Sequence, residues 1–217
     1  WPVHRAVCWG AGVAAALATV VGPLAEAAHR DFVAHMWAHL LIGMLAPLLL
    51  VLSAPVTLAL RTLSAVPARR LAALLRSVPM QVLAHPVPAA LLSAGGLWVL
   101  YRTPLLQAMQ SDPLVHLLVH AHLLAAGFLF TAAVIGLDPA PHRPDRRLVT
   151  VVLVLAAASH AILARSLVAA PPAGVPVAEA EAGAELMYTA GGWVEAAVIV
   201  IFCLRWYRAA GRRLVPA

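Results

Sequence analysis

Long apolar runs alternate with short polar segments along the whole chain, and this pattern predicts membrane-spanning helices. Six runs have or approach the roughly 20 apolar residues that a helix needs to cross a bilayer. They cover residues 6–28, 32–60, 87–100, 113–137, 148–169 and 185–207. Each run is continuously apolar, which excludes the alternating pattern of a membrane β-barrel. We therefore predict an all-α fold, a polytopic transmembrane bundle of about six helices that forms a single domain over residues 1–217.

Prolines and polar segments mark the places where the predicted helices bend or end. The second run is long enough to tilt, or to bend at Pro47 or Pro55. The third run is short and ends before Pro104. Residues 61–84 form an amphipathic stretch that we expect to lie on the membrane surface. Residues 170–183, which are rich in proline, alanine and glutamate, are predicted to form a flexible acidic loop.

The composition supports a membrane protein and excludes other classes. Of the 217 residues, 63% are hydrophobic and only 11% are charged, whereas a soluble domain carries roughly a quarter charged residues. The net charge of +6 comes from arginines between the apolar runs. Such a pattern sets membrane orientation rather than binding the phosphates of a nucleic acid. We therefore expect membrane lipid, and no nucleic acid, among the partners.

The arginines also predict the orientation of the bundle. If the N-terminus is cytoplasmic, twelve of the fifteen arginines lie on the cytoplasmic side and only Arg30, Arg102 and Arg165 lie outside. Because cytoplasmic loops of membrane proteins carry the excess of basic residues, both termini are predicted to be cytoplasmic. The chain begins at Trp1 without a methionine, as a fragment or a processed form would.

Histidines collect at one end of the predicted bundle. With this topology, seven of the ten fall in the outer half of the membrane, namely His29, His35, His39, His116, His120, His122 and His160. Four of them form two turns of the pattern His-x-x-x-His, one in the second run and one in the fourth. Residues four apart lie on one face of a helix, so each turn presents two imidazoles together.

Two such turns at matched depth predict a metal site formed by His35, His39, His116 and His120. Imidazole suits copper, zinc, iron and nickel, and a thioether such as that of Met36 favours Cu(I). His122, His160 and Glu195 are candidates for additional ligands or for orienting the imidazoles from outside the metal shell.

Simpler roles compete with ligation at several of these positions. A single histidine inside the membrane commonly makes a hydrogen bond between helices, and for His122 and His160 this role and ligation are equally supported. Met36 is better explained by packing, and His29 by a solvated loop. Because a carboxylate facing lipid is costly, Glu195 is predicted to face the bundle interior within reach of a histidine or an arginine.

Several segments resemble the cytochrome c oxidase assembly factor CtaG family. The most specific is FVAHMWAHLLIGMLAPLLLVLSAPVTLALR, with its histidine turn followed by two Ala-Pro pairs. WPVHRAVCWGAG, the His85-Pro86 pair, VHLLVHAHLLAAGFLF, SHAILARSL and GGWVE also look similar, so the resemblance extends over nearly the whole chain. Many members have a histidine before the proline that ends the third helix, where this chain has Arg102-Thr103-Pro104.

The resemblance implies a bacterial plasma-membrane protein that assembles haem–copper oxidase, with oxidase subunits as partners and no enzymatic activity. It implies copper, most plausibly as Cu(I) delivered at the outer face, and it assigns the histidines of the family to the same four positions. A membrane haem or quinone protein is the rival hypothesis, since His39 and His120 could serve as axial ligands of haem. A third alternative is a structural chaperone of the oxidase that binds no metal, and homodimerisation is left open.

Overall fold

The structure, a computed structural model, describes residues 1–139 and 144–214, with side chains up to residue 210. His142 and Arg143, and the side chains of Arg212 and Arg213, were all predicted to be cytoplasmic and lie outside this description. The described residues form helices and no strand. In order, the elements are α1 (Val3–Ala18), α2 (Pro23–Ala28), α3 (Phe32–Leu40), the π-helix η1 (Leu41–Leu45), α4 (Ala46–Ser53), α5 (Pro55–Thr62), α6 (Ala65–Leu75), α7 (Val78–Leu83), α8 (Pro86–Arg102), α9 (Leu105–Ser111), α10 (Pro113–Ile135), α11 (Arg146–Ala169) and α12 (Val177–Leu214).

The all-α polytopic architecture predicted from the sequence is confirmed. Within the described residues, four helical segments are long and apolar enough to cross a membrane: Phe32–Thr62, Pro113–Ile135, Arg146–Ala169 and Val177–Ala210. A fifth crossing is present if α8 and α9, which meet at a bend of 78°, form one broken span. Helix α1 is the sixth apolar helix, but it is shorter than a full span.

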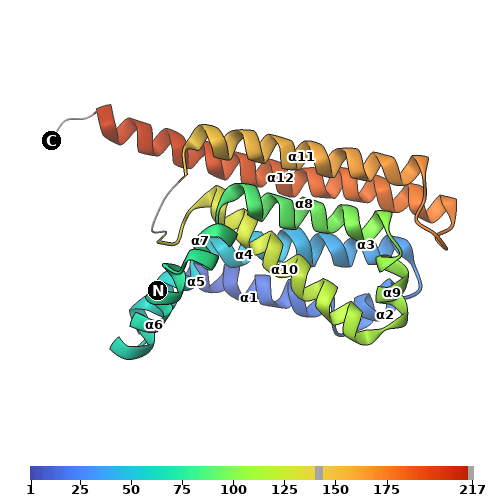
Figure 1. The fold of residues 1–217 in the computed structure, drawn as a ribbon, viewed down its shortest axis with the longest axis horizontal. Coiled ribbons are helices and arrows are strands. Elements are labelled where there is room, and N and C mark those ends of the chain that lie inside the picture. Colours follow the sequence, from blue (N-terminus) through green and yellow to red (C-terminus); the bar gives the residue numbers. More distant parts are fainter. Residues whose placement is uncertain (140–143, 215–217) are drawn as a thin grey trace.

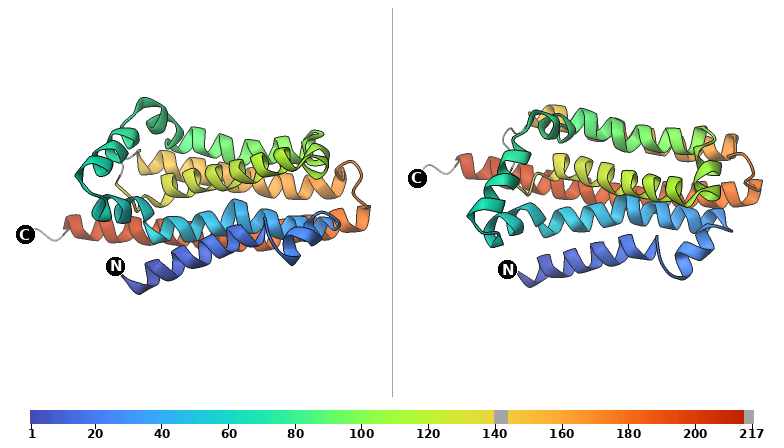
Figure 2. Two further views of the ribbon diagram at one scale, coloured as in Figure 1. Left: turned by 90° about the horizontal axis from the view of Figure 1, so that it is seen from below. Right: turned by 60° about the horizontal axis from the view of Figure 1, so that its bottom comes forward.

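The first predicted run is divided into two helices. Helix α1 has 16 residues and is therefore about 24 Å long, less than the roughly 30 Å of a hydrocarbon core. The chain breaks at Gly22, whose φ of 95° is accessible to glycine, and Pro23 then begins α2. Helix α1 packs along α4 at the edge of the bundle (Figure 2).

The second predicted run contains two breaks, both next to prolines. Pro47 has no N–H to donate to the carbonyl of Gly43, four residues earlier, and the helix takes the wider π turn of η1 just before it. Ala54 precedes Pro55 and adopts a left-handed conformation with φ of 51°, because proline disfavours the α region for the residue before it. The helix is therefore irregular beside both prolines at which a bend was predicted, and the whole segment Phe32–Thr62 still counts as one candidate span.

The two chain ends lie at the same end of the bundle. Figure 1 shows the N-terminus, the C-terminal end of α12 and the short helices α5, α6 and α7 together at one end, whereas α2 and α9 lie at the other. An even number of passes through the bundle produces this arrangement. We refer to the end with α2 and α9 as the outer end, following the orientation predicted from the arginines.

The segment predicted as an acidic loop is partly helical, which corrects that prediction. Helix α12 begins at Val177, so the alanine- and glutamate-rich residues 177–183 form its first two turns. Alanine and glutamate are good helix formers. The side chain of Glu179 also has a specific partner, because its Oε2 accepts a hydrogen bond from the backbone N–H of Phe32 at 3.1 Å.

Most buried apolar side chains belong to two large clusters at different levels of the bundle, and a small third cluster contains Ala28, Ala34 and Ala38. The outer cluster surrounds Met36, Leu100 and Leu163. The inner cluster surrounds Val51 and Phe202. The candidate functional side chains lie within the outer cluster and at the boundary between the two.

Candidate functional site

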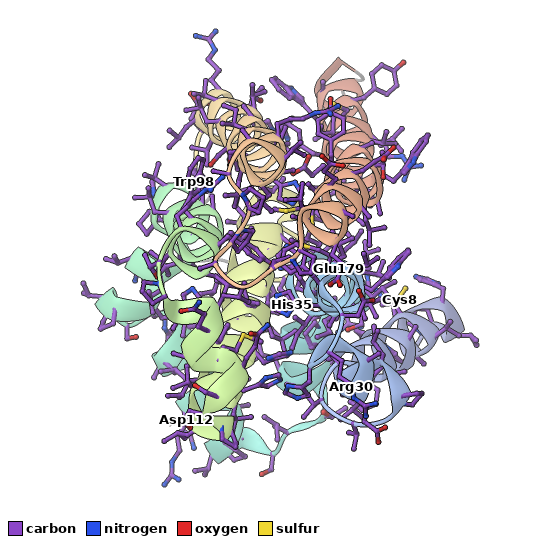
Figure 3. The ribbon with its side chains drawn as sticks, turned by 90° about the vertical axis from the view of Figure 1, so that its right-hand side faces the viewer. Cys8, Arg30, His35, Trp98, Asp112 and Glu179 are labelled. Atoms are coloured by element: carbon purple, nitrogen blue, oxygen red, sulfur yellow. The ribbon has the colours of Figure 1, made fainter. Side chains whose placement is uncertain are left out.

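Two carboxylates fix the start of α3, the helix that carries the first histidine turn. Asp31 caps the helix by accepting hydrogen bonds from Val33 N at 3.2 Å and Ala34 N at 3.0 Å. Glu179 of α12 accepts from Phe32 N, as described above. A cap of this kind stabilises a helix by about 1 kcal/mol, and the contact to α12 sets the rotation of α3. In Figure 3, which looks along the bundle from the outer end, Glu179 lies close to α3 and His35 lies near the centre of the molecule.

His35 contacts a tyrosine of another helix. Its Nε2 lies 3.2 Å from the hydroxyl of Tyr101, near the end of α8, and this hydroxyl also lies 3.5 Å from Sδ of Met36. Phe32 stacks on the imidazole at 5.8 Å between ring centroids. His35, Met36 and Tyr101 are all buried. The hydroxyl of Tyr101 therefore satisfies one nitrogen of His35 and covers the sulfur beside it.

The second histidine turn, on α10, forms a stack. The rings of His116 and His120 lie 4.2 Å apart and nearly parallel, as their spacing of four residues predicts. His29, at the end of α2, continues the stack with its ring 4.9 Å from that of His116. His29 is exposed, as predicted for a loop residue, but it also contacts His116 and so joins the other histidines. We call this set the histidine group; its members are His29, His35, His39, His116, His120 and His160. His120 Nδ1 lies 3.1 Å from the carbonyl of His116.

His39 and His160 meet deeper in the bundle. Their ring centroids are 6.4 Å apart, with 34° between the ring planes, and both residues are buried. His160 Nδ1 donates to Oε1 of Glu195 at 3.1 Å, which confirms the prediction that Glu195 faces a histidine. No protein atom described in the structure bonds either nitrogen of His39 or Nε2 of His160.

A cavity of about 70 Å³ lies beside this pair. Its polar lining includes His39, His160 and Glu195, and Met44 contributes a thioether. Most of the remaining wall is apolar and consists of side chains from α8, α10, α11 and α12. The volume is sufficient for roughly two water molecules or for one ion with little solvent.

Close contacts at two glycines hold the walls of this cavity together. A Cβ atom at Gly127 of α10 would lie 2.3 Å from the carbonyl oxygen of Gly43 in η1. A Cβ at Gly191 of α12 would lie 2.4 Å from Cε1 of His160. Neither approach is possible for a residue with a side chain, so glycine at these positions allows α10 to pack on the π-helix and allows the His160 ring to pack against α12.

The four histidines of the predicted metal site are close to one another but have different immediate partners. His35 lies near His116 and His120, and His39 lies near His160 and His120. Within the described part of the chain, however, no three His, Cys, Asp or Glu side chains are arranged to hold one metal ion. A single copper ion shared by His35, His39, His116 and His120 therefore stays a prediction.

Other predicted residues have identifiable structural roles. His122 is exposed, and its Nε2 lies 3.1 Å from the carbonyl of Leu92, so it joins α10 to α8. Arg102, which stands where many relatives were expected to carry a histidine before the proline, donates to the carbonyl of Ala170 at 2.8 Å and to the hydroxyl of Ser166. This arginine therefore joins α8 to the end of α11.

Two features of the site were not predicted. Tyr101 contacts both His35 and His39, the latter with an edge-on ring at 5.9 Å, yet nothing in its local sequence marks it. The pairing of His39 with His160 was also missed, although His160 was placed in the outer half of the membrane and Glu195 within reach of a histidine or an arginine. Gly191, in the Gly-Gly-Trp segment, was a usable signal because a glycine inside an apolar helix indicates close approach of another group.

These observations define the class to which the protein belongs. It is a polytopic helical membrane protein with a row of histidines in one half of its bundle. The chain belongs to the family of cytochrome c oxidase caa3 assembly factors, whose sequence model matches residues 1–209. The resemblance seen in the sequence is thereby confirmed.

The chain is also similar to larger mycobacterial proteins. An uncharacterised protein of Mycobacterium leprae and another of Mycobacterium tuberculosis are each 37% identical to it over 150 residues. The matched region is 66% of this chain but only 23% of each relative, so the chain corresponds to about a quarter of their length. No solved structure matches the chain significantly.

Proposed function

We propose that this protein binds copper among the histidines in the outer half of its bundle and delivers the ion to a haem–copper oxidase during assembly. The family supports the role in oxidase assembly. The chemistry of the buried side chains supports copper as the cargo. Oxidase subunits are the proposed receivers, a bacterial plasma membrane is the proposed location, and the role requires no catalytic residue.

The observation that carries the proposal is a set of buried imidazole nitrogens that have no hydrogen-bond partner among the described residues. They are both nitrogens of His39, Nδ1 of His116 and Nε2 of His160. An unpaired polar group in an apolar interior costs about 1–3 kcal/mol. A metal ion stabilises neutral imidazole by accepting its lone pair, and copper is among the metals that imidazole suits.

The arrangement of the rings supports movement of an ion along the group. His29 is exposed at the outer end and contacts His116, which stacks on His120. His120 lies near both His35 and His39. We therefore expect an ion that enters at His29 to move from one imidazole to the next toward His39.

The size of the cavity favours an ion over the rival haem. A pocket for a small organic ligand generally has at least about 300 Å³, whereas the cavity beside His39 and His160 has about 70 Å³. Haem would need a wide slot between its axial ligands. The cavity beside this pair therefore suits a metal ion better than a haem.

Metal analysis of the purified protein tests the proposal. We expect protein loaded with Cu(I) under reducing conditions in lipid nanodiscs to retain copper through gel filtration. We also expect oxidase from cells that lack the protein to contain less copper. An absorption spectrum with a Soret band and no bound copper would favour the haem alternative. Defective oxidase assembly with no metal on the protein would favour a structural chaperone.

A further inference from the structure

We infer that His39 and His160 form a two-coordinate site for Cu(I) at the inner end of the histidine group, and that Glu195 is its positioning residue. The inference rests on the proposed function, since it assumes that the protein handles copper. It differs from the four-histidine site predicted from the sequence, because His160 replaces His35, His116 and His120 as the partner of His39.

The separation of the two rings fits one ion between them. Their centroids are 6.4 Å apart. Two metal–nitrogen bonds of about 2.0 Å each make up about 4 Å of this distance, and the radii of the two rings make up the remainder. His160 offers Nε2, and His39 offers a free nitrogen in either ring orientation. Ligation by both residues therefore requires little movement of the helices.

The small number of donors favours Cu(I) over other ions. Structural Zn²⁺ generally takes four ligands, but no three His, Cys, Asp or Glu side chains in the described ranges, residues 1–139 and 144–214, are placed to share an ion. Cu(I) has a filled d shell and is stable with two nitrogen ligands in line. Met44 lines the same cavity, and its thioether is a soft donor that also suits this ion.

Charge gives a second reason for a monovalent ion. Among the residues that line the cavity, Glu195 is the only one with a formal charge at neutral pH when the histidines are neutral. A Cu⁺ ion beside this carboxylate leaves no net charge in the apolar interior. A divalent ion would leave one uncompensated positive charge there, which is strongly unfavourable.

The contact between Glu195 and His160 orients the donor. Because His160 Nδ1 donates to the carboxylate at 3.1 Å, the proton is held on Nδ1 and the lone pair is on Nε2. A carboxylate that fixes a histidine in this way is a common partner of metal-binding histidines, and its removal typically lowers metal affinity by about 10–100-fold. Glu195 thus acts on the ion through His160.

Two adjacent glycines provide a matched structural test. A methyl group at Gly191 would collide with the His160 ring, whereas a methyl group at Gly192 would meet no atom within 4 Å. Both substitutions change the helix in the same chemical way. We therefore expect Gly191→Ala to displace the His160 ring and weaken Cu(I) binding, and Gly192→Ala to leave it unchanged.

The experiment is a Cu(I) titration of the protein in nanodiscs, in competition with a chromogenic chelator and without oxygen. It is combined with X-ray absorption at the copper edge. We expect wild-type protein to show the edge feature of two-coordinate Cu(I) with nitrogen neighbours. His160→Ala should lose this feature, and Glu195→Gln should lower the affinity by about 10–100-fold. Glu185→Gln, an exposed carboxylate on the same helix, is the control for Glu195→Gln.

The outcomes separate this inference from the proposed function. Wild-type protein that binds no copper overturns both. Copper that is retained with wild-type affinity and edge shape by His160→Ala, but is lost in His116→Ala, overturns only the two-coordinate site and favours the four-histidine site. If His160→Ala does not fold, the test rests on Glu195→Gln and the two glycine variants. Equal Cu(I) affinities in these three variants and in wild type contradict the inference.

Discussion

The two histidine turns have the same spacing but different neighbours. On α10, His116 and His120 stack on each other, and the stack continues to an exposed histidine at the outer end. On α3, His35 and His39 are both buried, and each faces a different partner, Tyr101 for His35 and His160 for His39. Spacing within a helix determines which side chains share a face. The neighbouring helices determine whether those side chains act together.

The largest expected effect comes from removing each turn separately. We expect His35→Ala with His39→Ala to weaken Cu(I) binding at equilibrium by about 100-fold or more, equivalent to roughly 2.8 kcal/mol. We expect His116→Ala with His120→Ala to change the equilibrium affinity less than tenfold while slowing uptake, because these residues lie on the entry side. Chelator competition and stopped-flow loading measure the two quantities. Equal loss in both double variants would instead support a site shared by the two turns.

A second prediction concerns the contact that brings α10 against the π-helix. Gly127→Ala should destabilise the protein by about 1–3 kcal/mol, as overpacking of a tight contact does, because the added methyl group collides with the carbonyl of Gly43. Thermal unfolding in detergent gives the measurement. Gly95→Ala is the matched control, since a Cβ there meets nothing within 4 Å. Equal melting temperatures for the two variants would contradict the close approach of α10 and η1.

A smaller effect is expected at Tyr101. Tyr101→Phe removes the hydroxyl that contacts His35 and Met36. It should lower the free energy of unfolding by about 1 kcal/mol, because it leaves a buried nitrogen unpaired while hydrogen bonds inside membranes average near 0.6 kcal/mol. Tyr207→Phe, at a position that is 79% exposed, should show no change. An equal loss of stability in both variants would contradict a stabilising contact between the Tyr101 hydroxyl and His35.

The smallest effect is expected at His122, which shares α10 with the stacked pair but points elsewhere. His122→Ala removes the hydrogen-bonding contact to the carbonyl of Leu92 and the packing of the ring over Gly96. We expect a stability change of about 0.5 kcal/mol and no change in bound copper, as determined by elemental analysis. Loss of copper in this variant would mean that the histidine group extends to α8.

The features that could be predicted from the sequence are those that depend on composition and on local spacing. The apolar runs predicted the polytopic helical fold, and the cost of a lipid-facing carboxylate predicted that Glu195 contacts a histidine. The spacing of four residues predicted that His116 and His120 share one face of their helix, where the structure stacks their rings.

The features that were missed depend on how one helix is rotated against another. Tyr101 lies 66 residues from His35 in the sequence, and its contact follows from the rotation of α8 and α3 about their own axes. The same rotation decides that His39 faces His160. The periodicity of one apolar run does not determine how the neighbouring helix is rotated about its own axis. The partners of the histidines could therefore be identified only from the structure.

The π-helix η1 also makes the orientation of α3 depend on the type of turn that links it to α4. A π turn holds one more residue than an α turn, and each residue of a regular helix advances the chain by about 100° around its axis. If Leu41–Leu45 formed regular α turns with the same number of residues, α3 would be rotated by about that angle relative to α4. His35 and His39 would then leave the interior with every side chain of the site still present in the sequence. The rotation of the second span about its axis is thus as necessary for the site as the histidines that it carries.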